Sequence, residues 1–138
     1  GSTYIVVPTT TLKHLMVKYS LPGVDLLKVD IEGAEVELFQ SLDDEDLLKI
    51  SQITIEFHDF IEGLRIRQEV KRIKDRLTSL GFREISFQDS NKDVLFVQLR
   101  LAGVSYFEFF LVKRWVAIHL KWKEMIGRLK AWAKIFIT

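Results

Sequence analysis

The sequence predicts an α/β protein with a partial doubly wound sheet: parallel strands, a C-terminal antiparallel hairpin and an appended C-terminal amphipathic helix. Two observations support this fold class. Short apolar segments alternate with segments of helical periodicity up to residue 82, and such alternation is typical of parallel sheets. Two further apolar segments, at 82–87 and 94–99, are then separated only by the turn residues 89–93. This spacing predicts a hairpin.

The first buried strand is expected over residues 25–31, which read DLLKVDI. A nearly continuous apolar run is typical of a parallel strand that is covered on both faces. Lys28 and Asp30 interrupt the run, and because residues two apart share a face of a strand, their side chains are expected to lie together. Opposite charges on a buried face are costly unless they pair or take part in chemistry. Asp30 and Glu32 come at the carboxyl end of this strand, where ligands bind in open α/β sheets.

The other elements of the domain are expected from hydrophobic periodicity and capping residues. Gly33 is interpreted as a small residue that lets the start of the helix expected over 32–42 pack closely against a neighbour. Glu35 is expected on the surface of the same helix or as a capping partner. The expected elements are an edge strand or extended lead-in over 4–7, a helix over 12–19 with N-cap candidates Thr9, Thr10 and Thr11, a helix over 32–42, an acidic, solvated loop or short turn over 43–46, a second buried strand over 50–58, and an amphipathic helix over 65–80 that Gly81 ends.

The composition excludes several classes of protein. Hydrophobic residues make up 48% and charged residues 28% of the 138 residues, a mixture typical of globular rather than disordered chains. The sequence contains no cysteine, which excludes disulfides, thiolate metal sites and a cysteine nucleophile. No basic region precedes an apolar stretch near the N-terminus, so no signal peptide is predicted and we expect a cytoplasmic location.

Residues 101–138 differ from the rest of the chain in charge and pattern. They hold seven Lys or Arg residues and two Glu residues, whereas residues 1–100 are acidic overall. We therefore divide the chain into a domain over 1–100 and a basic, Trp-rich helical tail over 101–138. From Val104 a long helix is expected, with a stripe of apolar residues on one face. The stripe comprises Leu111, Trp115, Ile118, Trp122, Met125, Leu129 and Phe136.

The stripe has two interpretations. It packs on the domain or on another chain, as in a homo-oligomer, or the segment 104–137 makes a peripheral contact with a membrane through its Trp-rich face and flanking basic residues. No nucleic-acid partner is expected, because residues 1–100 are acidic and no recognition motif is present.

The segment Leu27–Glu35, which reads LKVDIEGAE, closely resembles the FkbM-type methyltransferase family, whose hallmark is K-[IV]-D-[IV]-E-G-x-E. The resemblance extends to Thr10–Leu12, Ile53–Glu56 and Leu80–Phe82, and so covers roughly residues 8–100. It implies a Rossmann-like methyltransferase sheet. It also implies an enzyme that transfers a methyl group from S-adenosylmethionine to a hydroxyl of a sugar, lipid or polyketide-type acceptor.

The sequence departs from the family pattern in its glycines. Such enzymes hold the cofactor on a Gly-rich turn after the first strand, but the seven glycines of this chain all stand singly. We therefore expect the chain to represent the C-terminal half of the domain, without the main cofactor-binding half, and no cofactor-binding residue is assigned. The alternative is a non-catalytic interaction or scaffold module, because an open sheet edge readily pairs with another strand.

Three residues are candidates for catalysis: Asp30, Glu56 and His58. Methyl transfer to a poorly acidic hydroxyl requires orientation of the reacting atoms and removal of a proton. Asp30 is the first candidate for this role, with capping of the next helix as its alternative. Glu56 and His58 share a face of the next strand. Together with Asp30 they could form a carboxylate–imidazole pair for base catalysis or an oxygen-rich Mg²⁺ site, although His58 could equally be hydrogen-bonded only.

Two further residues are candidates for substrate binding. Lys28 is expected to pair with Asp30 and keep it ionised, or to extend along the sheet face. Glu32 has as its alternative an interaction with the positive N-terminus of the next helix. No metal site is assigned, because the spacing of zinc ligands is absent, and a divalent cation has no other support in the sequence.

Overall fold

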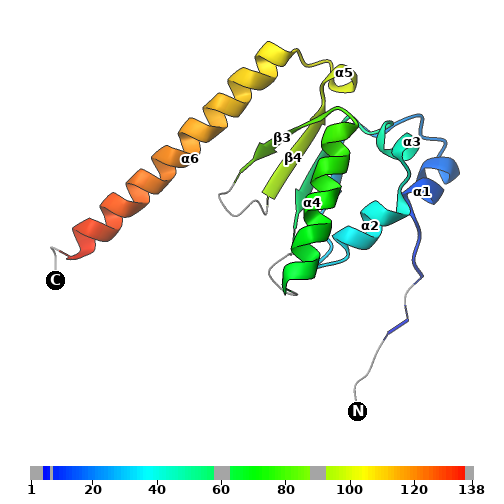
Figure 1. Cartoon of the computed structure of the whole chain (residues 1–138), viewed down its shortest axis with the longest axis horizontal. Coiled ribbons are helices and arrows are strands. Elements are labelled where there is room, and N and C mark those ends of the chain that lie inside the picture. Colours follow the sequence, from blue (N-terminus) through cyan, green and yellow to red (C-terminus); the bar gives the residue numbers. More distant parts are fainter. Residues whose placement is uncertain (1–4, 7, 58–62, 88–92, 136–138) are drawn as a thin grey trace.

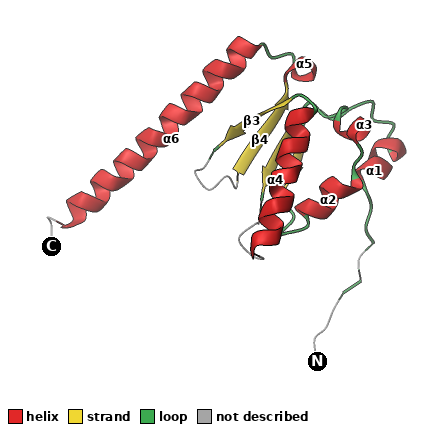
Figure 2. Ribbon diagram, in the orientation of Figure 1, coloured by secondary structure: helices red, strands yellow, loops and turns green. Residues whose placement is uncertain are grey.

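A computed structural model describes residues 5–6, 8–57, 63–87 and 93–135. They contain a mixed four-stranded sheet with helices packed on both faces (Figures 1 and 2). The strand order is β1-β2-β4-β3, in which β1 and β2 are parallel and the other neighbours are antiparallel. The prediction of an α/β fold with parallel strands and a C-terminal hairpin is confirmed. The strands are β1 Leu27–Val29, β2 Gln52–Glu56, β3 Phe82–Ser86 and β4 Asp93–Gln98.

The helices predicted over 12–19 and 65–80 are confirmed as α1 and α4. Thr11 is the N-cap of α1, and its side chain accepts a hydrogen bond from the backbone N–H of His14 at 3.1 Å. Of the extended segment expected over 4–7, only Ile5 and Val6 are described, and neither belongs to a strand. The described helices are α1 Leu12–Lys18, α2 Glu35–Ser41, α3 Asp44–Leu47, α4 Gly63–Ser79, α5 Leu99–Ala102 and α6 Tyr106–Ile135.

The larger core lies between one face of the sheet and helices α2 and α4. Strand register brings Ile53 opposite Phe96 and Ile55 opposite Val94, so these buried side chains point to the same face. Leu77 of α4 packs against them and is fully buried. Each such side chain contributes roughly 1.5–3 kcal/mol of hydrophobic stabilisation.

A second, smaller core lies on the opposite face of the sheet. There, Ile85 and Val97 of the hairpin form a buried cluster with Phe109 and Val116 of α6. Figure 1 shows α6 running along one flank of the molecule and past the end of the sheet. No described helix combines the length and apolar character that crossing a membrane requires.

The first strand differs from its prediction. It spans Leu27–Val29 rather than residues 25–31, and the expectation that it is covered on both faces is wrong. Leu26 and Ile31 are 56% and 42% exposed, and the Lys28 side chain is 71% exposed. The face of β1 that carries Lys28 is open to solvent, so its charge avoids the desolvation cost that a buried strand would impose.

The helix expected over 32–42 begins three residues later, at Glu35. Glu32 and Gly33 have φ angles of +53° and +104°, and these positive values interrupt a right-handed helix. The close-packing interpretation of Gly33 is wrong, because a Cβ atom added there would meet nothing within 4 Å. Glycine is favoured at this position by its backbone conformation.

The acidic run at 43–46 begins the short helix α3, so the short-turn alternative is confirmed and the solvated-loop alternative is wrong. Asp43 is its N-cap and accepts the backbone N–H of Asp46 at 2.8 Å. Asp46 itself is buried, with 4% of its surface exposed. Its side chain therefore belongs to the interior rather than to the charged surface that the sequence predicts.

The apolar stripe of the tail does not pack on the domain. Instead Phe109, Val116 and Leu120 contact the sheet, and they lie on the other side of α6 from the predicted stripe. The side chains of Leu129 and Phe136 lie outside the described part of the chain. The division into a domain over 1–100 and a tail over 101–138 stays a prediction. The exposed stripe residues are Leu111, Trp115, Ile118, Trp122 and Met125.

Candidate functional site

Two of the three catalytic candidates lie at the same edge of the sheet. Strands β1 and β2 are parallel, and their register pairs Val29 with Ile55. The next residues along the two strands are Asp30 and Glu56, so their backbones are neighbours at the carboxyl edge, and both residues are exposed. His58 lies outside the described residues, so its proposed pairing with these carboxylates stays a prediction.

Lys28 and Asp30 form the ion pair that the sequence predicts. The Lys28 Nζ atom donates a hydrogen bond to Asp30 Oδ2 at 3.1 Å. The two side chains are 71% and 34% exposed, and a pair in such a setting contributes only about 0–1 kcal/mol to stability. Its main consequence is geometric, because the bond turns Oδ2 of Asp30 toward Lys28 on the open face of the sheet.

Asp30 does not cap the helix that follows. The N-cap of α2 is Ala34, which makes no side-chain capping bond, so the capping alternative for Asp30 is wrong. Glu32 lies in the loop between β1 and α2, with an exposed side chain, and not in the first helical turn as expected. Its positive φ of 53° is uncommon for a residue other than glycine. Such outliers cluster at functional sites.

Glu35 holds the loop between β1 and α2 in place. Its side chain is buried, and its Oε1 atom accepts the backbone N–H of Gly33 at 3.1 Å and that of Ile31 at 3.4 Å. The prediction of a capping partner is confirmed in part, because the carboxylate serves the loop before the helix, and the prediction of a surface position is wrong. The E-G-x-E spacing was the available sequence signal for this role.

No group of three or more His, Asp or Glu side chains is placed to hold a metal ion among the residues described. The carboxyl edge thus offers oxygen acceptors from Asp30 and Glu56 and one cation from Lys28. Such a set can bind hydroxyl groups by accepting their hydrogen bonds, and an aspartate in contact with a hydroxyl can remove its proton.

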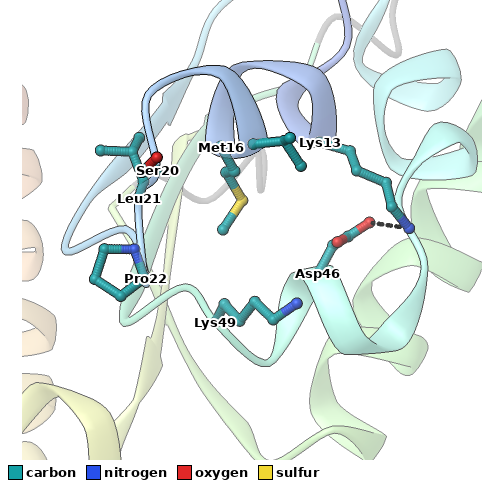
Figure 3. A pocket seen from close by; sticks show the side chains of 8 residues that line it. Lys13, Met16, Ser20, Leu21, Pro22, Asp46 and Lys49 are labelled. Atoms are coloured by element: carbon teal, nitrogen blue, oxygen red, sulfur yellow. Dashed lines mark ion pairs between the residues drawn. The ribbon is translucent and has the colours of Figure 1, made fainter.

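A surface cavity of about 340 Å³ lies between α1 and the end of α3 (Figure 3). Pro22, which precedes β1, and Lys49, which precedes β2, border it, so this cavity sits at the amino end of the parallel strands rather than at the Asp30 edge. It was not predicted, because the acidic run beside it was interpreted as a solvated loop. Its lining residues are Lys13, Met16, Val17, Ser20, Leu21, Pro22, Asp46 and Lys49.

Asp46, Lys13 and Lys49 supply the charge of this cavity. Asp46 Oδ2 is buried without a hydrogen-bond partner among the described residues, and its nearest cation is Lys13 Nζ at 3.5 Å (Figure 3). Lys13 also donates a hydrogen bond to Asp43 at 2.8 Å. That bond, followed by the one from the Asp46 backbone N–H, lowers the pKa of Asp43 to about 2, and it raises the pKa of Lys13.

The fold and the carboxyl edge define an α/β domain with acidic side chains at the ends of parallel strands. Residues 1–84 match the methyltransferase FkbM domain family, and the chain belongs to this family. A curated relative is the AMB antimetabolite synthetase AmbE of Pseudomonas aeruginosa, which is 33% identical over 79 residues. These residues make up 57% of this chain, and the chain spans 4% of the length of AmbE. No solved structure matches the chain.

The family match confirms the resemblance and corrects its extent. It covers the N-terminal part of the chain and ends at residue 84, rather than extending to residue 100. It does not support the assignment of the chain to the C-terminal half of the domain. Family membership indicates a methyltransferase, and methyltransferases of this family in general use S-adenosylmethionine.

Proposed function

We propose that this chain contributes to the transfer of a methyl group from S-adenosylmethionine to a hydroxyl of a sugar, lipid or polyketide-type acceptor. The observation that carries the proposal is the register of β1 and β2, which pairs Val29 with Ile55 and is followed on the two strands by the acids Asp30 and Glu56, within a chain of the FkbM methyltransferase family. The proposal includes a Rossmann-like sheet, which the parallel pair β1–β2 supports. Ligands bind at this edge in sheets of that kind.

Asp30 is proposed as the general base for the acceptor hydroxyl. The new bond joins the hydroxyl oxygen to the methyl carbon, the carbon–sulfur bond breaks with its electron pair left on sulfur, and the hydroxyl proton passes to a carboxylate oxygen of Asp30. Lys28 donates to Asp30 Oδ2, so Oδ1 is left to face the acceptor. General-base catalysis of this kind contributes about 10²–10⁴-fold to a rate.

Glu56 and Glu32 are proposed to hold the acceptor, and His58 stays a candidate for proton transfer. Glu56 neighbours Asp30 across the sheet, and Glu32 extends from the loop that Glu35 fixes. The charge of this edge fits the methyl donor, because carboxylates attract the positive sulfonium group. The donor supplies an activated methyl group when bound, and its binding residues are not assigned.

The test is methyl transfer with isotope-labelled S-adenosylmethionine and a panel of hydroxyl acceptors. Asp30→Asn is expected to lower the rate by about 10²-fold or more. The control is Glu37→Gln, which makes the same change at an exposed position of α2 and is expected to leave the rate unchanged. The proposal fails if calorimetry detects no binding of S-adenosylmethionine, or if Asp30→Asn retains full activity.

A further inference from the structure

Helix α6 presents a continuous apolar stripe on the side that faces away from the domain. Its members are 46% to 65% exposed and follow one another at alternating spacings of four and three residues, which places them on one face of a helix. Phe109 and Val116, which pack onto the sheet, each lie two positions before a stripe residue and so about half a turn away around the helix. The outward stripe consists of Leu111, Trp115, Ile118, Trp122 and Met125.

Basic side chains lie beside one edge of the outward stripe. Between Leu111 and Met125 the helix carries four Lys or Arg residues and a single acid, Glu124. Glu124 comes two positions after Trp122 and so lies on the far side of the helix from the stripe. Arg114 and Lys121 come one position before Trp115 and Trp122 and so lie beside the stripe, whereas Lys113 and Lys123, each two positions from a stripe residue, lie on the far side. All four basic residues are exposed.

We propose that α6 binds in the plane of an anionic lipid surface. The outward stripe enters the boundary between headgroups and acyl chains, and the flanking Lys and Arg side chains contact lipid phosphates. Helices that lie in this boundary typically combine Trp-rich apolar faces with basic flanks. Residues 1–100 are acidic overall, so an anionic surface repels the rest of the domain and attracts only α6, which orients the molecule on the membrane.

The charge pattern favours lipid over a second copy of the chain. Alternating spacings of four and three are also typical of a coiled-coil seam, in which oppositely charged residues beside the seam pair between helices. Here one flank carries Arg114 and Lys121, whereas the other carries His119 and Ile126, so these basic residues would find no acidic partner beside the seam of a parallel pair of α6 helices. Anionic lipids supply that counter-charge.

The experiment uses the full chain and its own fluorescence, because all three tryptophans of the sequence belong to α6. Vesicles of phosphatidylcholine with phosphatidylglycerol are compared with vesicles of phosphatidylcholine alone. We expect co-sedimentation with the anionic vesicles and a blue shift of the emission. Both effects should weaken as salt rises from about 0.1 M to about 1 M, because the Debye length falls from about 10 Å to about 3 Å.

Two variants test the stripe and its flank. The double variant Ile118→Gln with Met125→Gln keeps every tryptophan and should weaken binding to anionic vesicles by about tenfold or more, because two apolar side chains no longer enter the lipid. Lys121→Gln should weaken it by about fivefold, the effect of one basic residue near the surface. The matched control is Val17→Gln with Leu26→Gln, which removes two exposed apolar side chains far from the stripe and should leave binding unchanged.

Three results would overturn the proposal. The chain could fail to bind anionic vesicles, or it could bind neutral and anionic vesicles equally well. It could also form a concentration-dependent dimer by light scattering that the Ile118→Gln/Met125→Gln variant abolishes, with no vesicle binding, which would identify a second copy as the occupant. Circular dichroism of each variant confirms that the helix is still formed.

Discussion

A buried carboxylate determines the shape of the loop that carries the candidate site. Glu35 accepts two backbone N–H groups from the segment between β1 and α2. Burial of a charged group is costly unless hydrogen bonds replace its water. These bonds supply part of that replacement and hold the loop, with its two positive φ angles, between Asp30 and α2. Glu35 is therefore a positioning residue for the acidic edge rather than part of its reacting surface.

The Gly33→Ala variant is expected to lower the free energy of unfolding by about 1–2 kcal/mol. Its φ of +104° is strained for alanine, while the space around it is open, so the effect isolates backbone strain from any steric clash. Urea unfolding measures it. Gln40→Ala, an exposed position on α2, is the control and should change stability by less than about 0.5 kcal/mol. Equal stability of the two variants would contradict the prediction.

The ion pair of Asp43 with Lys13 should make stability depend on pH in the acid range. The hydrogen bond from Lys13, followed by the one from the Asp46 backbone N–H, lowers the pKa of Asp43 from 3.8 to about 2 in the folded protein, so the folded state binds this proton less readily than the unfolded state. The stabilisation is therefore complete above about pH 4–5 and is lost as the pH falls through about 2.

The measurement is the difference in unfolding free energy between the native chain and Asp43→Asn as a function of pH. This difference should be constant near neutrality and shrink below about pH 4. In a Lys13→Met background most of the pH dependence should disappear, because Lys13 is the largest cause of the pKa shift. An unchanged pH profile in that background would mean that the backbone N–H of Asp46, rather than Lys13, lowers the pKa of Asp43.

The site residues were predictable to different degrees for physical reasons. The pairing of Lys28 with Asp30 follows from the two-residue period of a strand and was predicted. The burial of Glu35 was not, because it depends on where α2 begins. Positive φ angles at Glu32 and Gly33 delay the helix by three residues. Because each residue rotates a helix by about 100°, such a delay changes which side chains face the core.

At the scale of elements, Arg76 connects three helices. From α4 it donates hydrogen bonds to the carbonyl oxygens of Phe39 and Leu42, at 2.9 Å and 2.8 Å, and to the Asp44 carboxylate at 2.7 Å. The last carbonyl groups of a helix lack intrahelical partners. Arg76 supplies partners at the end of α2 and at the same time holds the start of α3, so a single guanidinium group fixes the turn between them.

The Arg76→Met variant should lower the free energy of unfolding by about 2–4 kcal/mol, because it leaves two carbonyl groups with fewer hydrogen bonds and removes an ion pair. Arg76→Lys should recover only part of the loss, since an ammonium group lacks the planar fork of the guanidinium. Lys71→Met is the control. It removes an exposed pair with Asp75 that contributes at most about 1 kcal/mol. Chemical denaturation compares the three, and similar losses for Arg76→Met and Lys71→Met would contradict the assignment.

The elements best predicted are those with complete local signals. Helix α4 shows a regular apolar period ended by Gly81, and α1 follows a run of threonines. Of the interpretations of the apolar stripe of α6, only packing on the domain is wrong, because that helix has apolar residues on two opposite sides. Periodicity identified the outward stripe, whereas the contact with the sheet is made by Phe109 and Val116. Only the position of the hairpin decides which side is buried.

At the scale of the whole molecule, the sheet separates two cores of unequal size. The larger core, beneath α2 and α4, includes residues from β1, β2, β3 and β4. The smaller core joins only the hairpin and α5 to α6, so α6 is attached through few buried contacts. Regions with few buried apolar contacts open at lower free energy than the global core. We therefore expect α6 to open separately from the rest of the domain.

Two core variants should distinguish the opening of α6 from the unfolding of the rest of the domain. Leu77→Ala removes a fully buried side chain from the larger core and should lower the global free energy of unfolding by about 2–5 kcal/mol. Phe109→Ala affects the smaller core and should reduce the hydrogen-exchange protection of α6 amides while leaving that of α4 nearly unchanged. A parallel loss of protection in α4 and α6 would show that the two cores open as one unit.

Binding of lipid to α6 should leave the contact between α6 and the domain intact. The outward stripe and the sheet-facing residues occupy opposite sides of one helix, so binding at the stripe leaves Phe109 and Val116 in contact with the hairpin. The Ile118→Gln variant should then weaken vesicle binding and change the free energy of unfolding by less than about 0.5 kcal/mol, as expected for an exposed position. A larger loss of stability would mean that this side of α6 is covered in solution. The stripe would then be assigned to an interface within an assembly of protein chains rather than to a lipid surface.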